Sequence, residues 1–162
     1  MGMADGDDEH TTGPAPADDK VVRGIRFVTA DPQVIFDLLA DPSKHALIDG
    51  SGTVRSPSVD SPERLTLGAK FGMSMKQGVP YTTKNEVVEF EEPTLIAWRH
   101  IGKHVWRYRL RPVAGGTEVT EECDWGASWA SMGLKLSGAP KRNRKAIDAT
   151  LDRLAAHFAD AS

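Results

Sequence analysis

Two polar side chains interrupt segments whose other residues on the same face are apolar. His100 lies in the alternating segment 95–101, and Glu121 lies in the alternating segment 117–125. A buried carboxylate or imidazole is costly unless it is hydrogen-bonded, and burial or a partner then shifts its pKa. Together with Tyr108, these residues could supply an acid/base pair or hold the polar group of a ligand. Alternatively, His100 and Glu121 lie at strand ends where their side chains reach water, and this would also explain polar residues at these positions.

Other residues capable of chemistry give weaker patterns. His100 and His104 have the four-residue spacing of a metal site on a helix, but Gly102 between them indicates a turn. We therefore expect no metal and no cofactor. The single cysteine, Cys123, excludes an intramolecular disulfide, and its position inside a strand-like segment is typical of a packed, unreactive thiol. No nucleophile-elbow sequence is present, so a Ser-His-Asp triad is not predicted.

Helices must begin where local capping signals occur. Asp31 followed by Pro32 predicts a helix start, and apolar residues then recur at helical spacing up to Pro42. A short helical turn that carries His45 is expected next. The clearest helical pattern lies at the C-terminal end, near residues 140–159. Its apolar stripe consists of Ile147, Leu151, Leu154, Ala155 and Phe158.

Strands account for most of the remaining chain. The predicted strands are residues 21–29, 53–58, 69–75, 81–91, 95–101, 104–112 and 117–125. Short turns such as Gly102-Lys103 and Gly115-Gly116 join them, so consecutive strands should pair antiparallel. Residues 127–136 could form a short helix or a loop. A sheet with one apolar face must curve around something, and the C-terminal helix is the only large amphipathic element available to fill it.

Length and composition agree with one small domain. The chain has 162 residues, of which 40% are hydrophobic and 27% charged, and this excludes a wholly disordered chain or a collagen-like repeat. No apolar run reaches the ~18–20 residues of a membrane span, so we expect no integral membrane segment and a cytoplasmic location.

The net charge of −3 is unevenly distributed along the chain. Residues 1–19 contain six acidic residues and no Lys or Arg, whereas the other 143 residues contain 17 acidic and 20 basic residues. We expect residues 1–19 to be a disordered acidic tail and residues 20–162 to form the domain. Neither part is charged strongly enough to imply a nucleic acid or a strongly anionic membrane as partner.

Several short sequences, taken in order, carry a family likeness. They are residues 30–42 (ADPQVIFDLLADP), 67–71 (LGAKF), 85–93 (NEVVEFEEP), 96–99 (IAWR) and 115–121 (GGTEVTE). In this order the chain resembles the START-like, Bet v 1-like superfamily, also called SRPBCC or polyketide cyclase/dehydrase proteins. The resemblance implies an α+β helix-grip fold, in which a curved antiparallel sheet of about seven strands wraps around a long C-terminal helix and leaves a cavity.

The resemblance also implies a class of function. Members of the superfamily bind apolar molecules such as lipids, sterols or polyketides, and a minority are cyclases, dehydratases or hydrolases. The leading hypothesis is therefore binding or transport of a small hydrophobic ligand by a monomer or homodimer. One alternative is a polyketide cyclase/dehydratase-like enzyme that uses His100, Glu121 and Tyr108, and another is a module that binds a protein partner. The superfamily has no universal catalytic motif, so the resemblance assigns a cavity but no catalytic residue.

Alternation along the strands predicts which side chains would line such a cavity. Large and adaptable Met and aromatic side chains on one face are typical of an apolar binding site and also of a packed core. The predicted lining residues are Phe71, Met73, Met75, Val88, Phe90, Trp98, His100, Trp106, Tyr108, Glu121 and Cys123. The last helix begins with Lys141, Arg142, Arg144 and Lys145, which form either a solvated face or a site for an anionic group or acidic partner.

Overall fold

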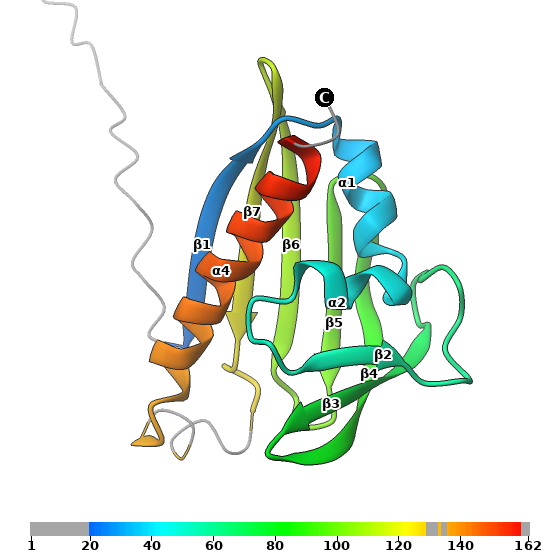
Figure 1. Ribbon diagram of the computed structural model, residues 1–162, viewed down its shortest axis with the longest axis vertical. Coiled ribbons are helices and arrows are strands. Elements are labelled where there is room, and N and C mark those ends of the chain that lie inside the picture. Colours follow the sequence, from blue (N-terminus) through cyan, green and yellow to red (C-terminus); the bar gives the residue numbers. More distant parts are fainter. Residues whose placement is uncertain (1–19, 129–132, 134–135, 160–162) are drawn as a thin grey trace, which may run out of the picture.

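A curved antiparallel sheet and a long helix dominate the computed structural model, which describes residues 20–128, 133 and 136–159 (Figure 1). Within these residues seven strands have the order β1-β7-β6-β5-β4-β3-β2, and every neighbouring pair is antiparallel. The strands are β1 (Val21–Val28), β2 (Val54–Pro57), β3 (Lys70–Gln77), β4 (Val79–Glu91), β5 (Leu95–His100), β6 (Val105–Val113) and β7 (Gly116–Asp124). The helical segments are α1 (Pro32–Leu39), the 3-10 turn η1 (Pro42–Lys44), α2 (His45–Ile48) and α4 (Ala139–Ala159). The predicted helix-grip fold is confirmed.

The two Asp-Pro pairs start helical segments in the same way. Asp31 lies before α1 and its side chain accepts a hydrogen bond from the Gln33 N–H at 3.0 Å. Asp41 accepts one from the Ser43 N–H at 2.9 Å before η1. Each carboxylate thereby satisfies a backbone donor that has no partner within the helical turn. The predicted helix starts at these positions are confirmed.

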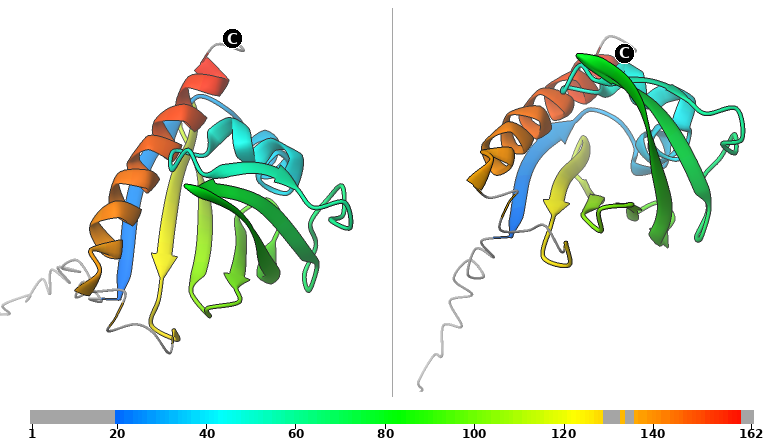
Figure 2. Two further views of the ribbon diagram at one scale, coloured as in Figure 1. Left: turned by 60° about the horizontal axis from the view of Figure 1, so that its bottom comes forward. Right: turned by 90° about the horizontal axis from the view of Figure 1, so that it is seen from below.

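The long helix α4 fills part of the concave side of the sheet. Its buried residues include Ile147, Leu151, Leu154 and Phe158, which are four of the five residues of the predicted stripe, and the fifth, Ala155, is partly buried. Figure 2, seen from below, shows the strands as an arc, with α4 beside β1 on the inner side. At Gly24 of β1, a Cβ atom would lie 2.6 Å from Ile147 Cγ2, so the helix and strand approach closely because this residue has no side chain.

On the convex side of the sheet, ion pairs join neighbouring strands. Glu122 of β7 pairs with Arg23 of β1 at 2.8 Å and with Arg107 of β6 at 3.1 Å. Arg107 also pairs with Glu89 of β4. Burial opposes ionisation of Glu122, but the bonds from Arg23 and Arg107 outweigh it and lower the pKa of this carboxyl. The charged side chains on the convex side of the central strands therefore mostly form ion pairs with one another.

Two sequence-based expectations concern residues that are not described. The predicted acidic tail, residues 1–19, lies outside the described residues. Most of segment 127–136, for which both a helix and a loop were possible, also lies outside them. In the described part of the chain, no helix is long and apolar enough to cross a bilayer.

Gly50 controls how closely the connection between α2 and β2 approaches α4. Its N–H donates a hydrogen bond to Thr150 Oγ1 at 2.9 Å. A Cβ atom at residue 50 would lie 2.6 Å from the Ala146 carbonyl oxygen and would also collide with the Thr150 nitrogen. Both of these are backbone atoms of a helix, so they cannot move away without distorting it. The connection is therefore held against α4 by a contact that only glycine permits.

We predict that Gly50→Ala lowers the free energy of unfolding by about 1–3 kcal/mol, the usual cost of overpacking. Urea denaturation followed by circular dichroism measures this change. Gly102→Ala is the matched control, because a Cβ atom there would lie 3.4 Å from His104 Nδ1, an ordinary contact. If the two variants unfold at the same urea concentration, the close approach of residue 50 to α4 does not contribute to stability.

Candidate functional site

A cavity of about 810 Å³ lies between the inner face of the sheet, the first half of α4 and the connection between α2 and β2. Small-molecule sites in proteins commonly have volumes of roughly 300–1,000 Å³. The apolar part of the lining consists mainly of Leu39, Ile48, Phe71, Met73, Met75, Trp98, Trp106 and Trp125. The cavity exists because α4 packs mainly along β1, so the inner faces of the more distant strands lack a helix to cover them.

Nine of the eleven residues predicted from alternation line this cavity. They are Phe71, Met73, Met75, Trp98, His100, Trp106, Tyr108, Glu121 and Cys123. Burial raises the pKa of the Cys123 thiol to about 12, as expected for a thiol that takes no part in chemistry at neutral pH.

The other two predicted lining residues, Val88 and Phe90, lie elsewhere. The register between β4 and β5 shifts between Val87 and Glu89, so Val87 is buried at 1% exposure while Val88 leaves the inner face. Phe90 packs edge-on against Phe36 of α1, with ring centroids 5.3 Å apart, at a distance from the cavity lining. The β-bulge shifts the phase of alternation, so Val88 leaves the inner face, whereas Phe90 remains on that face opposite Ile96 but lies under α1.

Four rings form a connected group around Trp98. His45 stacks on Trp98 with centroids 5.0 Å apart, and Phe71 and Tyr108 contact it at 5.8 and 5.7 Å. His45 Nε2 lies 2.8 Å from the Leu39 carbonyl oxygen, which can only accept, so this nitrogen carries a proton. Burial lowers the pKa of His45, and the ring is therefore neutral at physiological pH.

Glu121 and Tyr108 form a buried polar pair in the cavity wall. The Tyr108 hydroxyl donates a hydrogen bond to Glu121 Oε1 at 2.8 Å. Glu121 is 3% exposed, and its Oε2 has no hydrogen-bond partner among the described residues. Burial raises the pKa of Glu121 to about 8; the Tyr108 bond opposes this shift, and Asp49 and Asp148 add smaller contributions in the same direction as burial. At neutral pH this residue is therefore mainly an uncharged acid with one oxygen available to a ligand.

His100 does not pair with Glu121. Its ring stacks on that of His104 with centroids 4.4 Å apart, and its strand partner is Asn85, whereas Glu121 lies opposite Tyr108. Burial and the neighbouring His104 lower the pKa of His100 to about 3, so this ring too is neutral. The acid/base pair of His100 and Glu121 that the sequence allowed is therefore not formed, and Glu121 bonds to Tyr108.

No group of three or more His, Cys, Asp or Glu side chains is placed to hold a metal ion within residues 20–128, 133 and 136–159. The two histidines with suggestive spacing do not lie on a helix, because His100 ends β5 and His104 lies in the turn to β6. Their stacked rings line the cavity.

Sequence reasoning missed several polar residues of the site. Asn85 is buried, lines the cavity and has an Oδ1 atom without a partner among the described residues. It lies two residues before Val87, so the correct phase of β4 would have indicated it. His45 and Asp49 also line the cavity, but they come from the short α2 region, where no strand alternation applies.

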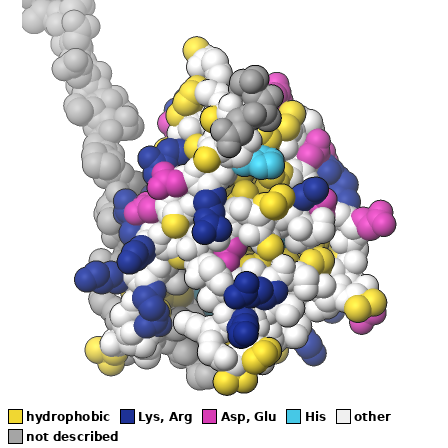
Figure 3. Space-filling view, in the orientation of Figure 1, with side chains coloured by type: hydrophobic (Ala, Val, Ile, Leu, Met, Phe, Trp, Pro, Cys, Tyr) yellow, Lys and Arg dark blue, Asp and Glu magenta, His cyan; other side chains and the backbone are white. Residues whose placement is uncertain are grey.

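The mouth of the cavity is marked by the lining residues that are also exposed. These are Ser51 from the connection between α2 and β2, Gln77 and Tyr81 from the β3–β4 hairpin, and Arg142 and Lys145 from α4. The basic start of α4 therefore belongs partly to the mouth, and a solvated helix face describes it incompletely. Figure 3 shows Lys and Arg side chains spread over the middle and lower parts of this face.

We predict that Glu121→Gln stabilises the fold at alkaline pH. The pKa of Glu121 is about 8 in the folded chain and 4.5 in its ordinary state, so the folded protein binds more protons between these values and loses stability as the pH rises through them. Glutamine keeps an oxygen for the Tyr108 hydroxyl and does not ionise. The gain over the wild type should reach on the order of 4 kcal/mol above about pH 8 and vanish below about pH 4.5.

Thermal or urea unfolding across this pH range measures the difference between the two proteins. Glu122→Gln is the matched control, because the lowered pKa of Glu122 gives it the opposite sign, and this variant should be less stable than the wild type at neutral pH. An unchanged pH dependence in Glu121→Gln would contradict the buried, uncharged state of Glu121.

Comparisons with solved structures agree with the fold. A Rhodobacter sphaeroides protein superposes with a TM-score of 0.70 at 15% identity, covering 91% of this chain and 97% of that one. Protein Ms6760 from Mycobacterium smegmatis superposes with a TM-score of 0.66 at 16% identity, covering 88% of this chain and 93% of that one. At these identities, the likeness concerns the fold alone.

Sequence comparison gives a nearer relative and a family. The uncharacterised protein Rv0088 of Mycobacterium tuberculosis is 36% identical over 146 residues, which are 86% of this chain and 64% of that protein. This chain thus spans less than two thirds of the length of that relative. Residues 20–159 match the family described as polyketide cyclase/dehydrase and lipid transport. With nearly the whole described chain matched and the helix-grip cavity in place, the protein belongs to the polyketide cyclase/dehydrase and lipid transport family.

Proposed function

We propose that the protein binds a small, largely apolar molecule that carries an uncharged polar group. The observation that carries this proposal is the cavity of about 810 Å³, whose wall combines Trp, Phe and Met side chains with a few buried polar atoms. Such a combination is typical of small-molecule sites, in which apolar area supplies affinity and the polar atoms fix orientation. Membership in a family described by lipid transport supports the same class of ligand.

The cavity wall suits an elongated ligand. Glu121 and Trp125 both line the cavity and are four residues apart along β7 and its end. At the rise of a strand, this separation corresponds to about 13 Å. A ligand with an apolar body of this length would extend along the wall from the Tyr108–Glu121 pair to Trp125.

The buried polar groups favour an uncharged polar group on the ligand. His45, His100 and Glu121 are all neutral at physiological pH, because burial shifts each pKa toward the uncharged form. A charged group placed among them would lose its hydration without a countercharge. A hydroxyl or carbonyl group, in contrast, could bond to Glu121 Oε2 or Asn85 Oδ1, which have no partners among the described residues.

A second candidate function, acid catalysis in the same cavity, is favoured by the Tyr108–Glu121 pair. An acid with a pKa of about 8 beside a substrate can donate a proton at neutral pH. This function would require a substrate whose reacting atom lies against Glu121 Oε2. For this candidate, Glu121→Gln should abolish turnover, whereas simple binding should survive the substitution.

We predict that Thr83→Trp blocks binding, because Thr83 lines the cavity and an indole ring would fill part of it. Thr82→Trp is the matched control, since Thr82 is exposed and alternation along β4 directs it to the opposite face. N-phenyl-1-naphthylamine, an uncharged dye, serves as the fluorescent probe of the apolar cavity. We expect its affinity to fall roughly tenfold or more in Thr83→Trp, as when a pocket loses its apolar contact area, and to remain unchanged in Thr82→Trp.

Native mass spectrometry of the protein incubated with fatty alcohols and fatty acids then compares uncharged with charged ligands. Preferential retention of the alcohol by the wild type, and loss of it in Thr83→Trp, would support the proposal. Equal probe binding by the two tryptophan variants would show that the cavity is not the binding site.

A further inference from the structure

The antiparallel order of the strands brings three separate connections to one end of the molecule. In such a sheet, successive turns alternate between its two ends. The β3–β4 turn, the β5–β6 turn and the chain leading into α4 therefore lie at the same end, which is the lower end in Figure 1. We call residues 75–84, 99–105 and 136–145 the mouth end, because each of these three segments contributes residues to the cavity lining.

Each segment of the mouth end presents an aliphatic side chain to solvent. Val79 in the β3–β4 hairpin is 75% exposed, Ile101 in the β5–β6 turn is 80% exposed, and Leu136 before α4 is 84% exposed. Tyr81, also in the hairpin, is 45% exposed. Single exposed apolar residues are common on protein surfaces, but here three separate segments each carry one at the same end.

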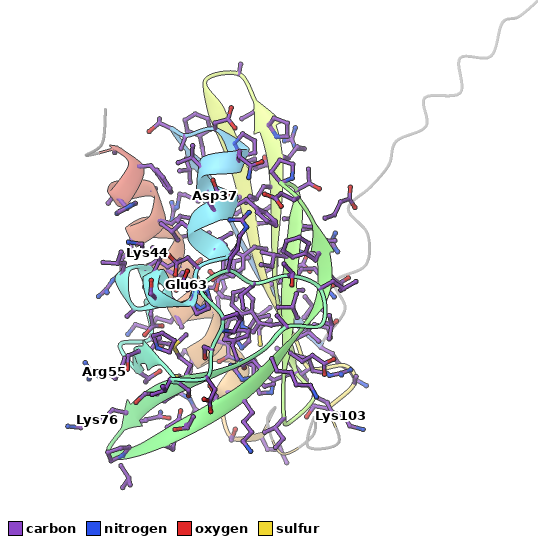
Figure 4. All side chains as sticks on the ribbon, turned by 90° about the vertical axis from the view of Figure 1, so that its right-hand side faces the viewer. Asp37, Lys44, Arg55, Glu63, Lys76 and Lys103 are labelled. Carbon is purple, nitrogen blue, oxygen red and sulfur yellow. The ribbon has the colours of Figure 1, made fainter. Side chains whose placement is uncertain are left out.

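The mouth end is also strongly basic. Its three segments contain eight Lys and Arg residues and no Asp or Glu. Two of the eight form ion pairs, Arg99 with Glu86 and Arg144 with Asp148. The other six form no ion pair with a described residue, and they are Lys76, Lys84, Lys103, Lys141, Arg142 and Lys145. Figure 4 shows Lys76 and Lys103 on opposite sides of the lower end, with Asp37 and Glu63 higher on the molecule.

The connections at the other end of the sheet have the opposite character. The links 29–31, 58–69, 92–94 and 114–115 contain four acidic residues, Asp31, Asp60, Glu63 and Glu92, and one basic residue, Arg64, which pairs with Glu92. The net charge of the chain therefore conceals a separation of charge along the sheet axis. An expectation based on net charge, that no strongly anionic surface is a partner, does not account for this separation.

We propose that the mouth end docks on the surface of an anionic lipid bilayer. Basic side chains near such a surface are attracted by its negative potential, and aliphatic side chains among them can enter the interface between headgroups and acyl chains. Exposed Val, Ile and Leu side chains have no favourable partner on the phosphate backbone of a nucleic acid, so the bilayer fits this surface better. Docking goes beyond the proposed function, and it places the cavity mouth at the bilayer, where an apolar ligand could pass between them.

Vesicle flotation tests docking with the full chain. The protein should float with vesicles of equal parts phosphatidylcholine and phosphatidylglycerol but not with phosphatidylcholine alone, and about 500 mM NaCl should reduce the bound fraction. The double variant Val79→Asp/Ile101→Asp replaces two of the exposed aliphatic side chains. Roughly tenfold less of this variant than of the wild type should bind to each vesicle. Val34→Asp is the matched control, because Val34 is 50% exposed in the first turn of α1, where an acidic residue is well tolerated.

The Thr83→Trp variant separates docking from ligand binding, since it should lose the fluorescent probe and still float with anionic vesicles. Three results would overturn the docking proposal: no flotation of the wild type with anionic vesicles, equal flotation of the double variant and Val34→Asp, or tighter binding to duplex DNA than to the vesicles. Failure of probe binding alone would contradict only the proposed function.

Discussion

The close packing of α4 against β1 is the contact on which the rest of the structure depends. Gly24 lets the helix approach the strand, and Gly50 lets the connection between α2 and β2 approach the helix from the other side. Held at one edge, α4 cannot cover the inner face of seven curved strands, and α1 covers only the part near Phe90. The uncovered part of that face, under Trp98, Phe71 and Met73, becomes the cavity wall. The cavity therefore follows from where the helix lies.

The buried polar groups of the cavity lower the stability of the fold, and packing alone does not require them. Glu121 is buried with only one of its oxygens bonded, and a Leu side chain at this position would pack without an ionisation cost. Proteins commonly retain such groups at sites where a ligand supplies the missing partner. His45 and His100 are likewise neutral, so the part of the wall that they form with Glu121 is polar but uncharged.

Much of the site was predictable because strand alternation is a local property. Nine lining residues follow from it, including Trp98, Tyr108 and Glu121. The prediction failed at Val88, because the bulge in β4 depends on pairing with β5 and has no clear local signal, and at Phe90, because α1 covers that part of the inner face. It also missed Asn85, which shares the corrected phase, and His45, whose place in the wall depends on how α2 packs against the sheet.

The amino-acid sequence by itself determined the elements: the Asp-Pro helix starts, the apolar stripe of α4 and the turns that make the sheet antiparallel. These depend on residues close together in the chain, where capping, periodicity and turn chemistry act. Only the tertiary structure decided that Glu121 bonds to Tyr108 instead of His100, and that three basic segments with exposed aliphatic tips share one end with the cavity mouth. The physical reason is that strand register and sheet curvature bring together residues that are far apart in the chain. Neither the net charge nor a local sequence pattern can predict which residues these are.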